Sequence, residues 1–247
     1  MIKFSKLILV SFLILLTSCR NDNSDTAFNN SQTEPALRLK KISYSTKGYN
    51  AEFTSEIKYD INDRIIQITS NSTTTDIIYD VQNRIVQIDG YYTDNPSVHT
   101  NSKKYEYIAD EIIISGLYSG VYKQEMTLFL NNSGLPIKTE QNVGDSIVET
   151  FFEYDNNMNI IHRYTNDFYE NNYYSYDDKK NPYYAFPLVL QNYLNGFNLI
   201  GKNNVKSIKY FDSTVNQFKT LNVLLEYDPN GYLTRLENVQ SVIHFFY

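Results

Sequence analysis

A Tyr-Asp dipeptide followed by a short polar turn recurs along this chain and constrains its fold more than any other feature. The two clearest copies are Tyr59-Asp60-Ile61-Asn62-Asp63-Arg64-Ile65 and, twenty residues later, Tyr79-Asp80-Val81-Gln82-Asn83-Arg84-Ile85. Weaker copies begin at Leu130, Tyr154, Tyr176 and Tyr227. An Asp side chain accepts hydrogen bonds from nearby backbone N–H groups, and Asn, Asp and Gly tolerate a positive φ. Each copy therefore predicts the corner of a β-hairpin.

The segments that flank these corners have the period of half-buried strands. Between residues 52 and 59 the apolar side chains share one face and the charged side chains share the other. After the corner Ile65 stands on the opposite face from Ile66 and Ile68, which suggests that part of the second face is covered. We therefore predict an all-β fold, a single curved or barrel-like antiparallel sheet built from successive hairpins.

One stretch, residues 187–195, has helical spacing. Pro187 suits a first helical turn, apolar side chains recur at helical intervals, and Gly196 suits a C-cap. We expect a short helix at about 187–195 that plugs or caps one open end of the sheet. A lid over a binding site and a helix that binds a partner are the alternatives.

The start of the chain has the parts of a lipoprotein signal peptide. Lys3 and Lys6 precede an apolar run over residues 7–16, and Leu16-Thr17-Ser18-Cys19 follows as a lipobox. This pattern resembles that of bacterial lipoproteins, which implies that Cys19, the chain's only cysteine, carries lipid. We expect a signal peptide at 1–18, a flexible tether at 19–36, and an antiparallel β domain at 37–247. Arg20-Asn21 after the cysteine is not an obvious signal for retention in the inner membrane, so we expect a protein anchored in the outer membrane through Cys19, on either its periplasmic or its surface leaflet.

The charge balance limits the class of partner. The formal net charge is −6, and removal of residues 1–18 takes away two lysines and no acid. An acidic chain of this kind is not expected to bind nucleic acid. Tyr and Phe dominate the aromatic residues, with 23 Tyr, 14 Phe and no Trp, and both types favour strands.

The sequence contains few candidates for catalysis or metal binding. The three histidines are far apart, and no spacing suggests a zinc site, a serine nucleophile elbow or a phosphate loop. We therefore expect no cofactor, no metal and no catalytic residue that the sequence identifies. Glu149 and Glu153 share a strand face, so a carboxylate pair for glycoside hydrolysis stays an alternative.

An aromatic cluster is the candidate binding site. It includes Tyr164, Phe168, Tyr169, Tyr173, Tyr174, Tyr176, Tyr183 and Tyr184. Aromatic faces with a polar rim suit a carbohydrate. A cross-strand ladder of tyrosines that holds the sheet together is the structural alternative, and we favour it.

Two families resemble this chain. The corners resemble the tyrosine-aspartate (YD, Rhs-type) repeats of large bacterial surface proteins, although Asp63 and Asn83 stand where that family has Gly. The lipobox, the Asn-rich tether and the spaced hairpins together resemble an uncharacterised bacterial lipoprotein family with a porin-like fold. These resemblances imply an architecture and no activity.

From these features we expect a lipid-anchored cell-envelope protein that is not an enzyme and binds a glycan or a protein partner. A polysaccharide-active hydrolase and a structural accessory subunit of an outer-membrane complex are the alternatives.

Overall fold

The computed structural model describes residues 38–49, 52–166, 170–195 and 201–247, which form eighteen strands and one helix. The first nine strands are β1 (Lys41–Thr46), β2 (Glu52–Tyr59), β3 (Ile65–Ser70), β4 (Thr73–Tyr79), β5 (Ile85–Tyr92), β6 (Asn95–His99), β7 (Lys103–Ile108), β8 (Glu111–Tyr118) and β9 (Val121–Leu130). The remaining elements are β10 (Pro136–Val143), β11 (Ser146–Tyr154), β12 (Ile160–Thr165), β13 (Asn171–Lys180), α1 (Leu188–Asn195), β14 (Asn203–Asp212), β15 (Gln217–Asn222), β16 (Leu224–Tyr227), β17 (Leu233–Glu237) and β18 (Ser241–Phe246). No helix within the described residues is long and apolar enough to span a membrane.

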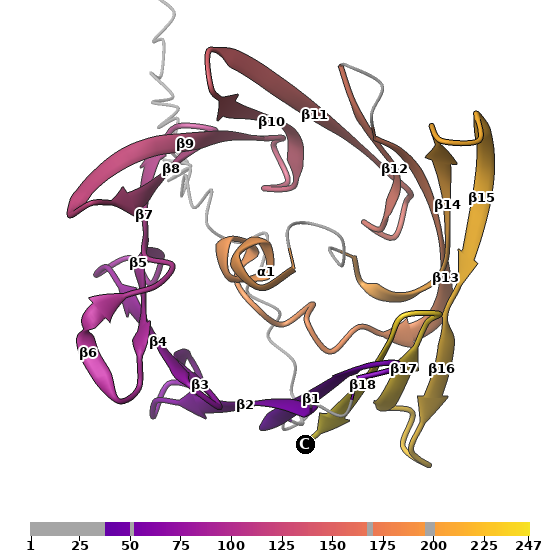
Figure 1. Cartoon of the computed structure of the whole chain (residues 1–247), viewed down its shortest axis with the longest axis horizontal. Helices are drawn as coiled ribbons and strands as arrows, with labels where there is room; N and C mark the ends of the chain where they lie inside the picture. The colour runs from indigo at the N-terminus through magenta and orange to yellow at the C-terminus, as the bar shows by residue number, and fades with distance from the viewer. Residues whose placement is uncertain (1–37, 50–51, 167–169, 196–200) are drawn as a thin grey trace, which may run out of the picture.

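The strands form one antiparallel sheet that curves into a nearly closed barrel (Figure 1). Most strands pair with their neighbours in the sequence, and β1 pairs with both β2 and β18, so the two ends of the sheet meet. β15 and β16 are two parts of one extended run, separated by Val223. β15 pairs with β14, whereas β16 pairs with β17. The predicted barrel-like antiparallel sheet is confirmed.

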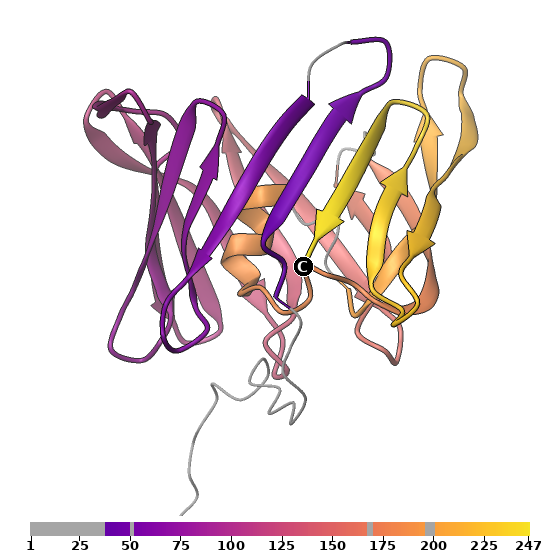
Figure 2. The same cartoon turned by 90° about the horizontal axis from the view of Figure 1, so that it is seen from below.

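Five of the six Tyr-Asp copies form hairpin corners with the same hydrogen bonds. In the first copy, Asp60 Oδ1 accepts from the backbone N–H groups of Asn62 and Arg64, at 2.8 and 3.0 Å. The residue before Arg64 is Asp63, whose φ is +65°. The same arrangement is present at the corners that follow Tyr79, Leu130, Tyr154 and Tyr227. Figure 2 shows the barrel from the side, with these corners at one end of it, which we call the corner end.

A β-bulge follows each of these corners and corrects one expectation from the sequence. Tyr59 pairs with Ile65, but Lys58 pairs with Gln67, so Ile66 is the extra residue. Ile65 and Ile68 consequently share the inner face and are both buried. The bulge therefore explains why apolar residues seem to lie on both faces of this strand in the sequence. The expectation that the second face of the sheet is partly covered is not needed to explain them.

The remaining copy, Tyr176-Asp177, is the fifth along the chain. It is not a hairpin corner, and that part of the prediction is wrong. β13 continues past Asp177 to Lys180, which pairs with Asn203. Between these two residues the chain enters the barrel as α1 and then returns at β14. Tyr176 then pairs with Val205. This copy therefore marks the place where the helical segment is inserted.

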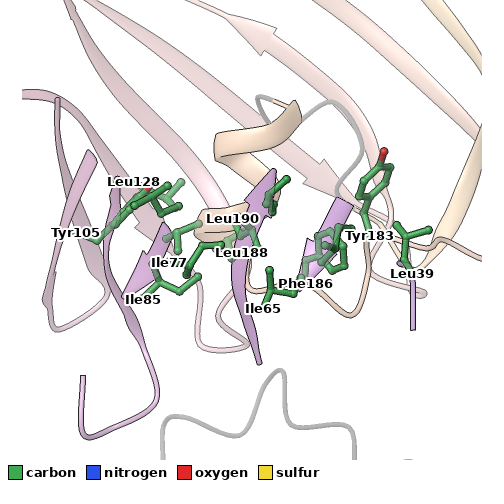
Figure 3. Close-up of a cluster of buried hydrophobic side chains, with 14 of the residues drawn as sticks. Leu39, Ile65, Ile77, Ile85, Tyr105, Leu128, Tyr183, Phe186, Leu188 and Leu190 are labelled. Carbon is green, nitrogen blue, oxygen red and sulfur yellow. The ribbon is translucent and has the colours of Figure 1, made fainter. Parts of the chain in front are cut away.

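The helix supplies part of the core inside the barrel. Leu188, Val189 and Leu190 on α1 are at most 8 % exposed and pack in one cluster with isoleucines of the wall. Figure 3 shows Leu188 and Leu190 beside Ile77 and Ile85. Burial of such side chains contributes about 1.5–3 kcal/mol each. The expected helix at 187–195 is confirmed, and it lies within the ring of strands.

Tyrosine hydroxyls link neighbouring hairpins at the corner end. Tyr79 donates to the carbonyl of Ile65 at 3.0 Å, and Tyr59 donates to that of Leu39 at 2.9 Å. Equivalent bonds join Tyr107 to Ile85, Tyr154 to Pro136, Tyr176 to Ile160 and Tyr247 to Leu233. Arg64 lies over the ring of Tyr79, 4.8 Å from its centroid. Burial raises the pKa of Tyr59 and Tyr79 to about 12, so both hydroxyls stay protonated donors at neutral pH.

Candidate functional site

Six aromatic rings from five neighbouring strands lie together on the outside of the barrel, and we call them the outer strip. They are Phe151 on β11, His162 and Tyr164 on β12, Tyr173 on β13, Phe211 on β14 and Phe218 on β15. Consecutive rings contact one another, along β12 for His162 and Tyr164 and across neighbouring strands for the others, with centroids between 4.2 and 6.1 Å apart.

The strand period places the outer strip away from the core. Phe152 and Tyr174 are buried, at 5 % and 9 % exposure, and their side chains point inward. Phe151 and Tyr173 precede them in the sequence and therefore point outward. Tyr173 is 41 % exposed and Phe218 is 44 % exposed, so the centre of the strip is accessible from outside.

The rings at the centre of the strip stack face to face. His162 and Tyr173 lie 4.2 Å apart with an angle of 5° between their planes, and His162 and Tyr164 lie 4.6 Å apart at 27°. The His162 ring is fixed by Asn171 on Nε2 at 2.9 Å and by Glu153 near Nδ1 at 3.3 Å. Stacking of this kind covers the ring faces and leaves the ring edges toward solvent.

Two lysines flank the strip. Lys209 Nζ lies 5.0 Å from the centroid of the Phe218 ring, which is the geometry of a cation–π contact. At the other side Lys138 Nζ lies 4.4 Å from the centroid of the Phe129 ring and donates to Glu140 at 2.6 Å. The hydrogen bond to Glu140 is the main cause that raises the pKa of Lys138. Lys209 thus places a positive charge at one side of the strip, whereas the charge of Lys138 at the other side is balanced by the carboxylates of Glu140 and Glu149.

The structure separates the aromatic residues that the sequence grouped together. Tyr164 and Tyr173 belong to the outer strip. Tyr174, Tyr176 and Tyr183 face the core, where Tyr183 packs edge-on against Phe186 and Phe245. Tyr184 is partly exposed in the segment before α1. Phe168 and Tyr169 lie outside the described residues, as does Cys19.

Four members of the outer strip were not predicted from the sequence. His162 lies two positions before Tyr164, and alternation along the strand 160–165 places the two on one face, so the sequence pattern could have identified it. Phe211 and Phe218 face each other across β14 and β15, which depends on strand register. Register between β14 and β15 is not visible in the sequence alone.

The two acids considered for hydrolysis contact different basic side chains. Glu149 lies 3.3 Å from Lys138 Nζ, whereas Glu153 lies 3.3 Å from His162 Nδ1. Both lie on β11 two positions from Phe151 and share its outer face. Within the described part of the chain, no group of three His, Cys, Asp or Glu residues is arranged to hold a metal ion.

Comparisons with known proteins find likeness in structure alone. No family model matches the chain, and no curated protein matches it. A porin-like protein from Bacteroides uniformis aligns with 11 % identity over 84 % of this chain and 97 % of its own length, with a TM-score of 0.42. A porin-like protein from Bacteroides vulgatus aligns with 15 % identity over 85 % of this chain and 98 % of its own, with a TM-score of 0.41. A TcdB2-TccC3-Cdc42 structure aligns with 9 % identity over 76 % of this chain and 12 % of that chain, with a TM-score of 0.27.

Proposed function

We propose that the protein is a lipid-anchored, non-catalytic module of the cell envelope whose outer strip binds a protein partner. The observation that carries this proposal is the strip itself, a continuous aromatic surface over five strands. On β2 to β4 the outer face carries the polar side chains Glu56, Lys58, Gln67 and Asp76, together with single apolar residues such as Ile78. Aromatic residues are enriched at the centres of protein interfaces, and contiguous apolar patches mark interaction sites.

The chemistry of the strip favours a particular kind of partner. Aromatic ring edges carry partial positive charge, and Lys209 adds a full positive charge beside Phe218. A complementary surface presents carboxylate or carbonyl oxygens next to apolar side chains. An accessory subunit that docks through this strip onto a larger outer-membrane complex fits the same description.

A glycan is the weaker candidate for the strip. Sugars bind aromatic side chains by stacking on open ring faces, and the faces of His162, Tyr164 and Tyr173 lie against one another. A hydrolase is weaker still, because a glycosidase needs two carboxyl groups about 5–10 Å apart across one gap. Glu149 and Glu153 instead lie on the outer face, where Glu149 contacts Lys138 and Glu153 contacts His162.

Lipidation at Cys19 is the second part of the proposal, and it is supported by the lipobox in the sequence. Cells that express the full chain or Cys19→Ala are labelled with a radioactive fatty acid and then fractionated. We expect label on the wild-type protein, in the outer-membrane fraction, and none on Cys19→Ala. Equal labelling of both would contradict the anchor.

Affinity capture of the full chain from crosslinked cells tests the partner. Tyr173→Ser and Phe218→Ser each remove one accessible ring of the strip, and Tyr92→Ser removes a ring of similar exposure, 45 %, elsewhere on the barrel. We expect one stoichiometric partner with the wild type and with Tyr92→Ser, and at least a tenfold lower yield with the two strip variants. Capture that is the same for all four proteins would refute the role of the strip.

A glycan array with the same full-length proteins separates the alternatives. Binding to a polysaccharide that is lost in Tyr173→Ser would replace the protein partner by a glycan. Turnover of a polysaccharide that is lost in Glu149→Gln or Glu153→Gln would establish the hydrolase.

A further inference from the structure

We infer that the interior of the barrel contains a second binding site, for one neutral sugar residue, that is separate from the outer strip. A pocket of about 180 Å³ lies inside the barrel, between α1 and the wall formed by β7 to β10. Asn192 and Tyr193 line it from the helix. This volume is below the roughly 300–1,000 Å³ of pockets for drug-sized ligands, so it suits a single ring.

The apolar side of the pocket belongs to the core. Tyr105 and Ile114 are 5 % and 3 % exposed and pair with each other across β7 and β8. Met126 pairs with Ile114 from β9. These side chains give the ligand an apolar surface, and the C–H face of a sugar ring packs well against such a surface.

An ion pair lies next to this apolar side, two positions along β7 from Tyr105 and farther from the corner end. Lys103 Nζ contacts Glu125 Oε2, and the Tyr118 hydroxyl donates to Glu125 Oε1. The side chains of Lys103 and Glu125 are 20 % and 19 % exposed. Lys103 pairs in register with Gly116, and a Cβ at Gly116 would overlap the Glu125 carboxylate. A glycine at position 116 therefore makes room for the ion pair.

Amide groups complete the polar side of the pocket. Gln141 on β10 and Asn192 on α1 both line it, and among the described residues no hydrogen bond engages either side-chain amide. The helix that carries Asn192 is fixed to the wall, because the Tyr193 hydroxyl donates to the carbonyl of Asn101 at 2.9 Å. Asn192 is thus held in place by its helix, Gln141 is exposed, and both amides are open to a ligand.

These groups together specify the class of ligand. Lys103 and Glu125 neutralise each other, so the pocket has no net charge to attract an ion. An amide offers both donors and acceptors, and so does a hydroxyl group of a ligand. A ligand that has several hydroxyls, one apolar face and no charge matches all three features, and a neutral monosaccharide unit is of this class.

Titration of the full-length protein in detergent with neutral monosaccharides tests the inference. The probes are glucose, galactose, mannose and N-acetylglucosamine at millimolar concentrations, with glucuronate as the charged comparison, followed by calorimetry and ligand-observed NMR. Gln141→Leu and Asn192→Leu each remove one amide, and Gln82→Leu makes the same change at an exposed corner. We expect at least one neutral sugar to bind the wild type and Gln82→Leu, and to bind each amide variant about ten times more weakly.

Several results would overturn this site. They are the absence of binding by any neutral sugar, tighter binding of glucuronate, and unchanged affinity in a folded amide variant. If Gln141→Leu fails to fold, Asn192→Leu decides, because Leu is a good helix former at a helix position. Tyr173→Ser, which alters only the outer strip, is expected to bind the sugar like the wild type. Loss of sugar binding in Tyr173→Ser would show that the two sites are not separate.

Discussion

Asp177 accepts a hydrogen bond from the backbone N–H of Asn204, 27 positions further along the chain, at 3.1 Å. At the first corner Asp60 accepts the equivalent bond from Arg64, only four positions further, at 3.0 Å. The N–H of Lys179 donates to the same oxygen of Asp177, as happens at the other corners. The Tyr176-Asp177 copy therefore keeps the hydrogen bonds of a corner, while the chain between Lys179 and Asn204 extends into the barrel. Through this insertion a barrel made of hairpins acquires an internal helix.

Substitution of Asp177 tests this relationship. Asp177→Ala removes the acceptor for both backbone N–H groups and for the Tyr227 hydroxyl, so we expect it to lower the free energy of unfolding by about 1–3 kcal/mol. Asp178→Ala is the matched control, because the Asp178 side chain is 86 % exposed, and it should change the free energy by less than about 0.5 kcal/mol. Urea unfolding measures both. Equal effects of the two changes would contradict the shared corner.

Each tyrosine hydroxyl at the corner end should make its own contribution to the free energy of unfolding. Tyr79→Phe deletes the donor to Ile65 and keeps the ring beneath Arg64, so we expect a loss of about 0.5–1.5 kcal/mol. Tyr49→Phe, at a side chain that is 74 % exposed, is expected to have no measurable effect. The two variants are compared by urea unfolding at neutral pH.

Stability should fall at alkaline pH because the folded protein raises the pKa of Tyr59 and Tyr79 from about 10 to about 12. A raised pKa means that the fold favours the protonated hydroxyl. The contribution to stability is therefore complete below pH 10 and is lost as the pH rises through 12. Unfolding in urea at a series of pH values measures this loss, and tyrosinate absorbance follows the ionisation. Tyr79→Phe should lose less stability over this range than the wild type does.

The last corner tests the requirement for a positive φ. Gly231 has a φ of +83°, and a Cβ placed there meets no atom within 4 Å. A side chain at this position therefore costs free energy through the strained backbone conformation and not through a steric clash. We expect Gly231→Val to lower the free energy of unfolding by about 1–3 kcal/mol. Asn230→Val, one position earlier in the same exposed turn, should cost much less. Similar melting temperatures for the two variants would refute the assignment of this turn.

The sequence predicts the corners and strands well because their signals are local. An Asp that accepts two nearby N–H groups, and a residue that tolerates positive φ, occur within five positions of each other. The helix was predicted for the same reason, since its apolar spacing and Pro187 are local features. The bulge that follows the first corner was not predicted. Simple alternation places Ile65 and Ile68 on opposite faces of the strand, whereas the one extra residue of the bulge places them on the same face.

The candidate site was harder to predict because it depends on which strands are neighbours. Tyr173 and Tyr174 are adjacent in the sequence, but one lies in the outer strip and the other in the core. His162 and Phe218 are 56 positions apart, and the sheet brings both to the ring of Tyr173. The internal pocket likewise requires the insertion after Asp177, which places Asn192 in the same pocket as Gln141.

Site-specific photo-crosslinking in living cells tests the central claim, that the outer strip binds a protein partner, most directly. A photo-reactive amino acid replaces Tyr173 at the centre of the strip or, as the control, Lys58 on the outer face of β2. We predict one discrete crosslinked product of higher mass from position 173 and none from position 58. Absence of a product at position 173, or the same product from both positions, would contradict the claim.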